Sequence, residues 1–275
     1  TMDRARSGDV VSSSPRDETS VRVAVRVRPL LPLEPQDSVC LFKVKNQPQL
    51  VLGKERSFTF DHVFDTRSQQ EELSSDCVRP LIDSLFLGYN ATIFAYGQTG
   101  SGKTYTMGSA APGASETRGI IPRAISEIFE RVSRLRATHR FQLRVSFLEI
   151  YNEEIRDLLD PTKGKVLAVR EDSEGGVSVV GAEEEIAGSA EQMLQCLHRG
   201  TLARTTGATN MNEVGRPRAA PAAPARAPRS TPSSRAPQVS SRSHAIFTLS
   251  VEWRTGNFQG GGGTTPTSPA GAAAA

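Results

Sequence analysis

The residues best suited to chemistry stand in one short stretch, residues 97–104. The stretch reads GQTGSGKT and matches the pattern G-x-x-x-x-G-K-[ST] at every position. Its three glycines let the backbone curl so that successive N–H groups point toward an anion. We expect Lys103 to reach the β- and γ-phosphates and the Thr104 hydroxyl to bind Mg²⁺. The pattern therefore predicts a nucleoside-triphosphate site, whose residues are Gly97, Gln98, Thr99, Gly100, Ser101, Gly102, Lys103 and Thr104.

The elements around this loop have the order that such a site requires. An apolar run at 91–95 predicts a buried strand leading into the loop. A helix beginning at Lys103 would direct the positive end of its dipole toward the phosphates. Helical spacing of apolar residues predicts further helices at 69–87, 121–135 and 189–202, the last capped by Ser189. Short strands are expected within 41–60, at 166–170 and at 177–180, and longer strands at 141–151 and 244–253. The alternative, a Gly/Ser-rich turn with a chance lysine, does not explain this order of strand, loop and helix.

Four segments resemble the kinesin motor family. The phosphate loop with its flanks, AYGQTGSGKTYTM at 95–107, is the closest match, and R-x-R-P at 26–29, FTFDHVF at 58–64 and LEIYNEEIRDLL at 148–159 agree with it. The likeness extends over residues 21–253, apart from a segment at 215–239. It implies an α/β fold of the P-loop NTPase, kinesin-motor type, with a central mixed sheet flanked by helices. Taken alone, 152–159 predicts a short helix after a strand.

The resemblance also implies roles for residues on either side of the loop. Arg26, Arg28 and Pro29 would lie beside the adenine and ribose, and Tyr105 would stack on the adenine. Without the resemblance, the alternating apolar and basic residues at 21–29 predict only a half-buried strand with a solvated basic face.

The first switch of the family reads N-x-x-S-S-R-S-H, and Asn212 and the block 240–244 carry it here. By resemblance, Ser241 would complete the Mg²⁺ shell, which suits a hard cation that prefers oxygen ligands. Ser240 and Asn212 would place the γ-phosphate and the attacking water. Arg242 would pair with a glutamate of the second switch. With Lys103, these are the predicted catalytic residues.

A segment at 215–239 separates the two parts of this switch. It contains seven Ala, six Pro, five Arg and no acidic residue, a composition that predicts disorder. Its removal restores the family's spacing, which favours a retained intron or a misplaced exon boundary; the rival explanation is a genuine inserted loop. Its five arginines exceed the net charge of +3 of the whole chain. The net positive charge of the chain therefore comes from this segment and does not indicate a nucleic-acid surface.

These patterns divide the chain into three parts. Residues 1–20 are polar and are predicted to be a disordered leader. Residues 21–254 are predicted to be a partial kinesin motor domain, and 255–275 a low-complexity tail. The family pattern ends after Arg254, before the D-x-A-G-x-E of the second switch. We therefore expect a fold that is incomplete at its C-terminal end, and a chain that is inactive by itself.

Composition excludes some other classes of protein. The three cysteines are widely spaced, so neither a disulfide framework nor a zinc site is predicted. There is no run of eighteen apolar residues, so no membrane span is expected.

The predicted function is that of a microtubule motor that hydrolyses ATP, with ATP and Mg²⁺ bound and the microtubule as partner. The resemblance further implies a dimer formed through a stalk outside this chain, and a place in the cytoplasm on the cytoskeleton. Within the family, the chain resembles the chromokinesin-related class, and its ciliary, Hedgehog-pathway branch most. One alternative is a non-motile scaffold that binds nucleotide or a partner. Another is nucleic-acid binding by the Arg/Pro/Ala segment, which lacks interleaved aromatic residues for stacking on bases.

Overall fold

The computed structural model describes residues 21–32, 34, 41–53, 55–108, 117–160, 167–171, 176–214, 243–255 and 272–274. The predicted leader, the 215–239 segment and most of the tail lie outside these residues. The chain divides into two units, residues 1–66 and 67–275, and each is described by itself. No helix of the described part is both long and apolar enough to cross a membrane.

The first unit consists of short strands. β1 (Ala24–Arg26) pairs in parallel with β5 (His62–Phe64). A separate antiparallel group contains β2 (Leu41–Lys43), β3 (Gln49–Leu52) and β4 (Arg56–Thr59). The short strands predicted for this region are confirmed.

The second unit begins with the helix predicted at 69–87. It is continuous but contains three segments: α1 (Gln70–Leu73), the π-helical η2 (Ser74–Val78) and α2 (Arg79–Phe86). Pro80 has no N–H to donate and its ring crowds the preceding turn, which accounts for a widened turn just before it. Leu73, Val78, Ile82 and Leu85 are buried along this helix.

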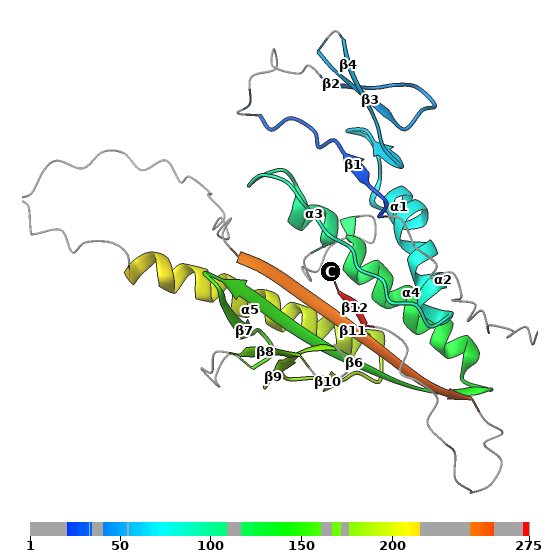
Figure 1. Ribbon diagram of the computed structural model, residues 1–275, viewed down its shortest axis with the longest axis vertical. Coiled ribbons are helices and arrows are strands. Elements are labelled where there is room, and N and C mark those ends of the chain that lie inside the picture. Colours follow the sequence, from blue (N-terminus) through cyan, green and yellow to red (C-terminus); the bar gives the residue numbers. More distant parts are fainter. Residues whose placement is uncertain are drawn as a thin grey trace, which may run out of the picture. The chain divides into compact units, whose positions relative to one another are not determined.

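Two long antiparallel strands form the centre of the second unit (Figure 1). β6 (His139–Tyr151) and β11 (Ser243–Thr255) pair along their whole lengths, from Ser243 opposite Tyr151 to Thr255 opposite His139. β10 (Glu185–Ile186) lies on the other side of β6, and β12 (Ala272–Ala274) pairs with β11. The middle of one face of the long pair is buried, and its buried apolar residues are Leu143, Val145, Phe147, Phe247, Leu249 and Val251.

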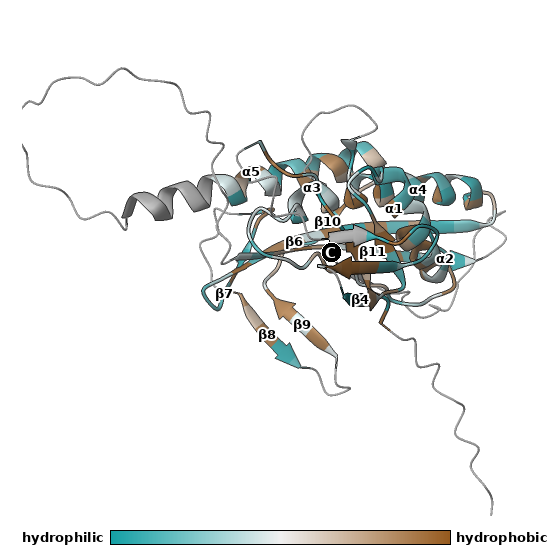
Figure 2. Ribbon diagram, turned by 90° about the horizontal axis from the view of Figure 1, so that it is seen from above, coloured by the Kyte–Doolittle hydropathy of each residue, from teal (hydrophilic) through white to brown (hydrophobic). Residues whose placement is uncertain are grey.

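The helices of the second unit cover this buried face. α4 (Ile120–Leu135) is amphipathic, and Figure 2 shows hydrophobic and hydrophilic residues alternating along it. α5 (Ala190–Val214) approaches so closely that a Cβ at Gly200 would stand 2.2 Å from Cδ1 of Phe147. The predicted cap of α5 is present, because the backbone N–H of Gln192 donates to Ser189 Oγ at 3.2 Å. The helix nevertheless continues twelve residues beyond the end expected at Leu202.

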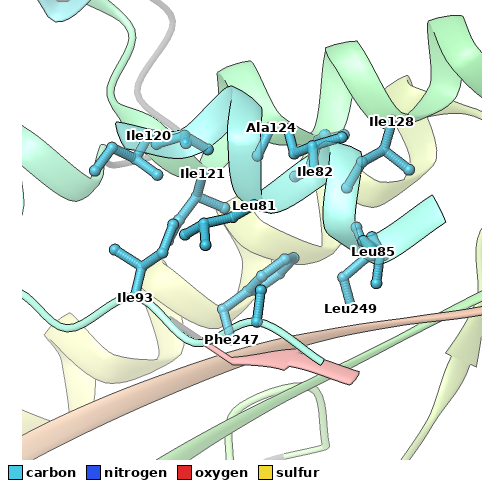
Figure 3. Close-up of a pocket in the computed structure, with 13 residues that line it drawn as sticks. Leu81, Ile82, Leu85, Ile93, Ile120, Ile121, Ala124, Ile128, Phe247 and Leu249 are labelled. Atoms are coloured by element: carbon cyan, nitrogen blue, oxygen red, sulfur yellow. The ribbon is translucent and has the colours of Figure 1, made fainter. Parts of the chain in front are cut away.

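An apolar pocket lies between α2, α4 and β11 (Figure 3). Leu85 of α2, Ile128 of α4 and Phe247 of β11 are among the residues that line it. Ile93 also points into it, from the segment before the glycine-rich loop. None of the loop residues 97–104 lines the pocket, so it is a packing feature separate from the predicted nucleotide site.

The strand predicted at 91–95 is absent from the structure. Thr92 makes an isolated bridge, and the rest of 91–97 forms no strand. Phe94 and Tyr96 are 88% and 101% exposed, whereas Ala91 and Ile93 line the apolar pocket. The alternation of apolar contacts expected for a strand is therefore present. The continuous hydrogen-bonded neighbour that defines a strand is not present in the described residues.

The short helix predicted at 152–159 is also wrong. β7 (Glu154–Asp157) folds back on β6, with Glu154 opposite Tyr151. Asn152 and Glu153 form the two-residue turn, with φ of 50° and 66°. Two successive positive φ angles match a type I′ turn, which joins antiparallel strands tightly. β8 (Ala168–Glu171) and β9 (Val177–Val180), by contrast, form the predicted pair of small strands.

Candidate nucleotide-binding site

The glycine-rich loop adopts a conformation that only its glycines tolerate easily. Gly100 and Gly102 have φ of 83° and 99°, in the left-handed region that strains other residues. Gly102 is the N-cap of α3 (Lys103–Met107). At Gly97, a Cβ would stand 2.5 Å from Ser101 Oγ. The glycine positions of the motif are thus required by the backbone of this loop.

Lys103 folds back across the loop. Its Nζ donates to the carbonyl oxygen of Gly97 at 2.7 Å and to that of Gln98 at 2.9 Å. The side chain is half-buried, so its positive charge is held against the loop backbone. These two bonds engage two of the three ammonium donors. The lysine of the motif is therefore held at the loop, and its contact with a phosphate stays a prediction.

The other loop residues are open to solvent. Gln98, Thr99, Gly100 and Thr104 are exposed, and Ser101 and Gly102 are half-buried. The Thr104 hydroxyl at the start of α3 is an oxygen donor of the kind that Mg²⁺ takes. At Gly100 no atom lies within 4 Å of the place that a Cβ would take. The residues present therefore fit a triphosphate with Mg²⁺.

Gln70 supports the short helix after the loop, and the sequence reasoning missed it. This α1 side chain is 2% exposed, and its Nε2 donates to the carbonyl oxygen of Tyr105 at 2.7 Å. A helix of five residues is too short to be stable in isolation, so tertiary contacts of this kind must hold α3. The signal in the sequence that could have indicated this role is a polar residue at the start of a helix whose inward-facing residues are otherwise apolar. Tyr105 itself is 56% exposed, and its stacking on the adenine stays a prediction.

The first unit contains the three residues predicted to flank the adenine and ribose, which are Arg26, Arg28 and Pro29. Arg28 is engaged in a two-point ion pair, in which Nη1 donates to Glu34 Oε2 at 2.7 Å and Nη2 donates to Oε1. The hydrogen bonds from Arg28, followed by that from the Leu31 N–H, lower the pKa of Glu34 to about 2. Arg26 ends β1 and Pro29 is exposed. Their contact with a nucleotide stays a prediction, and Glu34 is a further residue that sequence reasoning missed.

The first switch is described only at its two flanks. Asn212 lies in the last turn of α5. Ser240, Ser241 and Arg242 lie outside the described residues, and their roles stay predictions. β11 begins at the next residue, Ser243.

A glycine-rich loop that opens a helix and holds a lysine across its own carbonyls defines the class of P-loop nucleotide-binding proteins. Comparison with known families specifies this class further. The family model described as "Kinesin motor domain" matches residues 26–216. The chain belongs to the kinesin motor domain family.

Individual relatives support the same conclusion. Kinesin-related protein 8 of Dictyostelium discoideum is 45% identical over 243 residues, which cover 86% of this chain and 12% of that protein. The human kinesin-like protein KIF27 is 44% identical over 240 residues, covering 86% and 15%. The human chromosome-associated kinesin KIF4A is 43% identical over 240 residues, covering 85% and 17%. The chain thus spans less than a fifth of the length of these relatives.

A solved structure confirms the fold. The structure titled "Structure of a fast kinesin: Implications for ATPase mechanism and interactions with microtubules" superimposes with a TM-score of 0.75 at 32% identity, covering 93% of this chain and 64% of that chain. The predicted α/β kinesin-motor fold is therefore confirmed, as is the likeness to the chromokinesin-related class. The narrower ciliary, Hedgehog-pathway branch stays a prediction.

Proposed function

We propose that this chain is the nucleotide-binding part of a motor that hydrolyses ATP to move along microtubules. The observation that carries the proposal is the position of Lys103, whose ammonium lies on the carbonyls of Gly97 and Gln98 inside a loop of left-handed glycines. Membership of the kinesin motor domain family supports the choice of ATP and of the microtubule as partner. Activity of the whole protein is part of the proposal, since the relatives are much longer.

The loop residues have distinct tasks in this proposal. The backbone N–H groups of 97–104 hold the phosphates, and Lys103 exchanges its carbonyl partners for phosphate oxygens. Thr104, joined by Ser241, supplies oxygen ligands to Mg²⁺, which when bound offsets negative charge on the β- and γ-phosphates. Asn212 and Ser240 position the γ-phosphate and the water. Catalysis then depends on positioning and charge rather than on a covalent step.

The residues at the adenine end of the site are proposed from the resemblance to the family. Tyr105 offers an exposed ring for stacking. Arg26, Arg28 and Pro29 would flank the base and ribose. Dimerisation through a stalk outside this chain and a cytoskeletal location, with the cilium as a candidate, belong to the same proposal.

Lys103→Ala tests the nucleotide site directly. We expect the affinity for ATP with Mg²⁺ to fall by at least about tenfold, or about 1.4 kcal/mol, because the ammonium is the cation that the loop places on the phosphates. Fluorescence titration of a labelled ATP analogue would measure it. Lys45→Ala is the matched control, since Lys45 is an exposed lysine of the first unit outside the loop. Unchanged affinity in the Lys103 variant would refute the site.

A second measurement separates a motor from the non-motile scaffold considered above. The relatives are all named as kinesins, which does not favour the scaffold. Microtubules should raise the rate of ATP turnover by the complete protein. Nucleotide binding without that rise would support the scaffold instead.

A further inference from the structure

One guanidinium joins three elements at the flanks of the first switch. Arg204 of α5 donates from Nε to Glu149 Oε1 at 3.2 Å, and from Nη2 to Ser243 Oγ at 2.9 Å and the Ser243 carbonyl oxygen at 3.2 Å. Glu149 belongs to β6 and Ser243 to β11. We call Arg204, Glu149 and Ser243 the α5 clamp.

The clamp is a built feature of the interior rather than a surface ion pair. The side chains of Arg204 and Glu149 are 22% and 10% exposed. A carboxylate this buried is costly unless a partner neutralises it, and Arg204 supplies that partner. Opposite Glu149 on β11 stands Ala245, a small residue on the same face of the strand pair.

The α5 clamp lies next to both flanks of the first switch. Ser243 directly follows the predicted switch residues Ser240, Ser241 and Arg242 in the chain. Arg204 lies eight residues before Asn212 on α5, a distance of about 12 Å along a helix. The clamp therefore ties the helix that carries the first part of the switch to the strand that follows the second part.

We propose that Arg204 is a positioning residue for the first switch, acting through Ser243 and Glu149 to hold its two flanks in register. This inference rests on the proposed function of the nucleotide site. Because Arg204 belongs to α5 and not to the phosphate loop, its loss should affect contacts that depend on the γ-phosphate more than binding of the diphosphate. Recognition of the γ-phosphate and turnover would fall together.

The test compares Arg204→Gln with Arg199→Gln in the complete protein. Arg199 lies on the same helix and forms an ion pair with Glu185 of β10, away from the switch flanks, so it is a matched control. We expect Arg204→Gln to lower kcat for ATP at least about tenfold. We also expect it to reduce the preference for a non-hydrolysable ATP analogue over ADP, at unchanged ADP affinity. Arg199→Gln should leave both quantities as in the wild type.

Milder variants separate positioning from folding. Ser243→Ala removes one acceptor and keeps the carbonyl, so it should lower kcat and the triphosphate preference in the same direction but less. If Arg204→Gln fails to fold, this variant and Arg204→Lys decide the question. Wild-type kcat and preference in Ser243→Ala and Arg204→Lys, or equal effects of the Arg204 and Arg199 variants, would overturn the inference. Failure of the wild type to bind nucleotide would instead refute the proposed function, and the inference with it.

Discussion

Lys103, Gln70 and Glu34 illustrate three ways in which single residues shape this molecule. Lys103 was evident from its motif, and the structure places its ammonium on the carbonyls of Gly97 and Gln98. Gln70 and Glu34 belong to no motif, yet one holds the backbone of α3 and the other holds Arg28. Their roles depend on residues 35 and 6 positions away, which a local pattern does not connect.

The Arg28–Glu34 pair predicts an acid-sensitive contribution to stability in the first unit. The pKa of Glu34 is about 2 in the folded chain, against an ordinary value of 4.5. The folded state therefore binds its proton less readily than the unfolded state. The stabilisation is present above about pH 4.5 and is lost as the pH falls toward 2. An NMR titration of the Glu34 carboxyl should show a midpoint near 2.

Arg28→Gln provides the comparison for this titration. Without the guanidinium, the pKa of Glu34 should return most of the way to 4.5, held down only by the Leu31 N–H. A midpoint near 4.5 in the wild type would contradict the ion pair.

At the scale of elements, close contact between α5 and β6 decides how the helix packs. Gly→Ala in a helix usually stabilises by about 1 kcal/mol. At Gly200 the added Cβ would stand 2.2 Å from the ring of Phe147, which is 5% exposed. We expect Gly200→Ala to lower the free energy of unfolding by about 1–3 kcal/mol, as overpacking does. Urea denaturation would measure it.

A second substitution tests whether this contact is the cause. Phe147→Leu in the Gly200→Ala background removes the ring and should recover part of the lost stability. A stabilised Gly200→Ala variant would mean that helix propensity outweighs the clash. The same closeness explains why α5 accepts a glycine in its interior, where propensity alone disfavours one.

At the scale of the whole second unit, the apolar pocket between α2, α4 and β11 leaves room for more packing. Ala124 of α4 is one of the residues that line it (Figure 3). We expect Ala124→Leu to raise the free energy of unfolding by about 1 kcal/mol, as cavity-filling changes commonly do. Thermal or urea denaturation would show it.

The matched control adds the same side chain to the opposite side of the helix. Ser133→Leu lies on the exposed face of α4 and has no pocket to fill, so no comparable gain is expected there. If both variants gained equally, a general effect of the added leucine rather than the pocket would be responsible, since helix propensity favours alanine over leucine. If Ala124→Leu lost stability, the space between the elements would be too narrow for the larger side chain.

The sequence by itself determined the phosphate loop, its glycines and lysine, the family, and the long helices and strands. These follow from patterns within a few residues: the spacing of G-x-x-x-x-G-K-[ST], apolar residues at helical intervals, and alternation along β6 and β11. Only the tertiary structure decided that 91–95 lacks a paired strand, that Asn152 and Glu153 turn a hairpin, and that Arg204 joins Glu149 to Ser243. The state of 91–95 and the contacts of Arg204 depend on partners distant in the chain. At the hairpin, pairing with the neighbouring strand outweighs the local preference for helix.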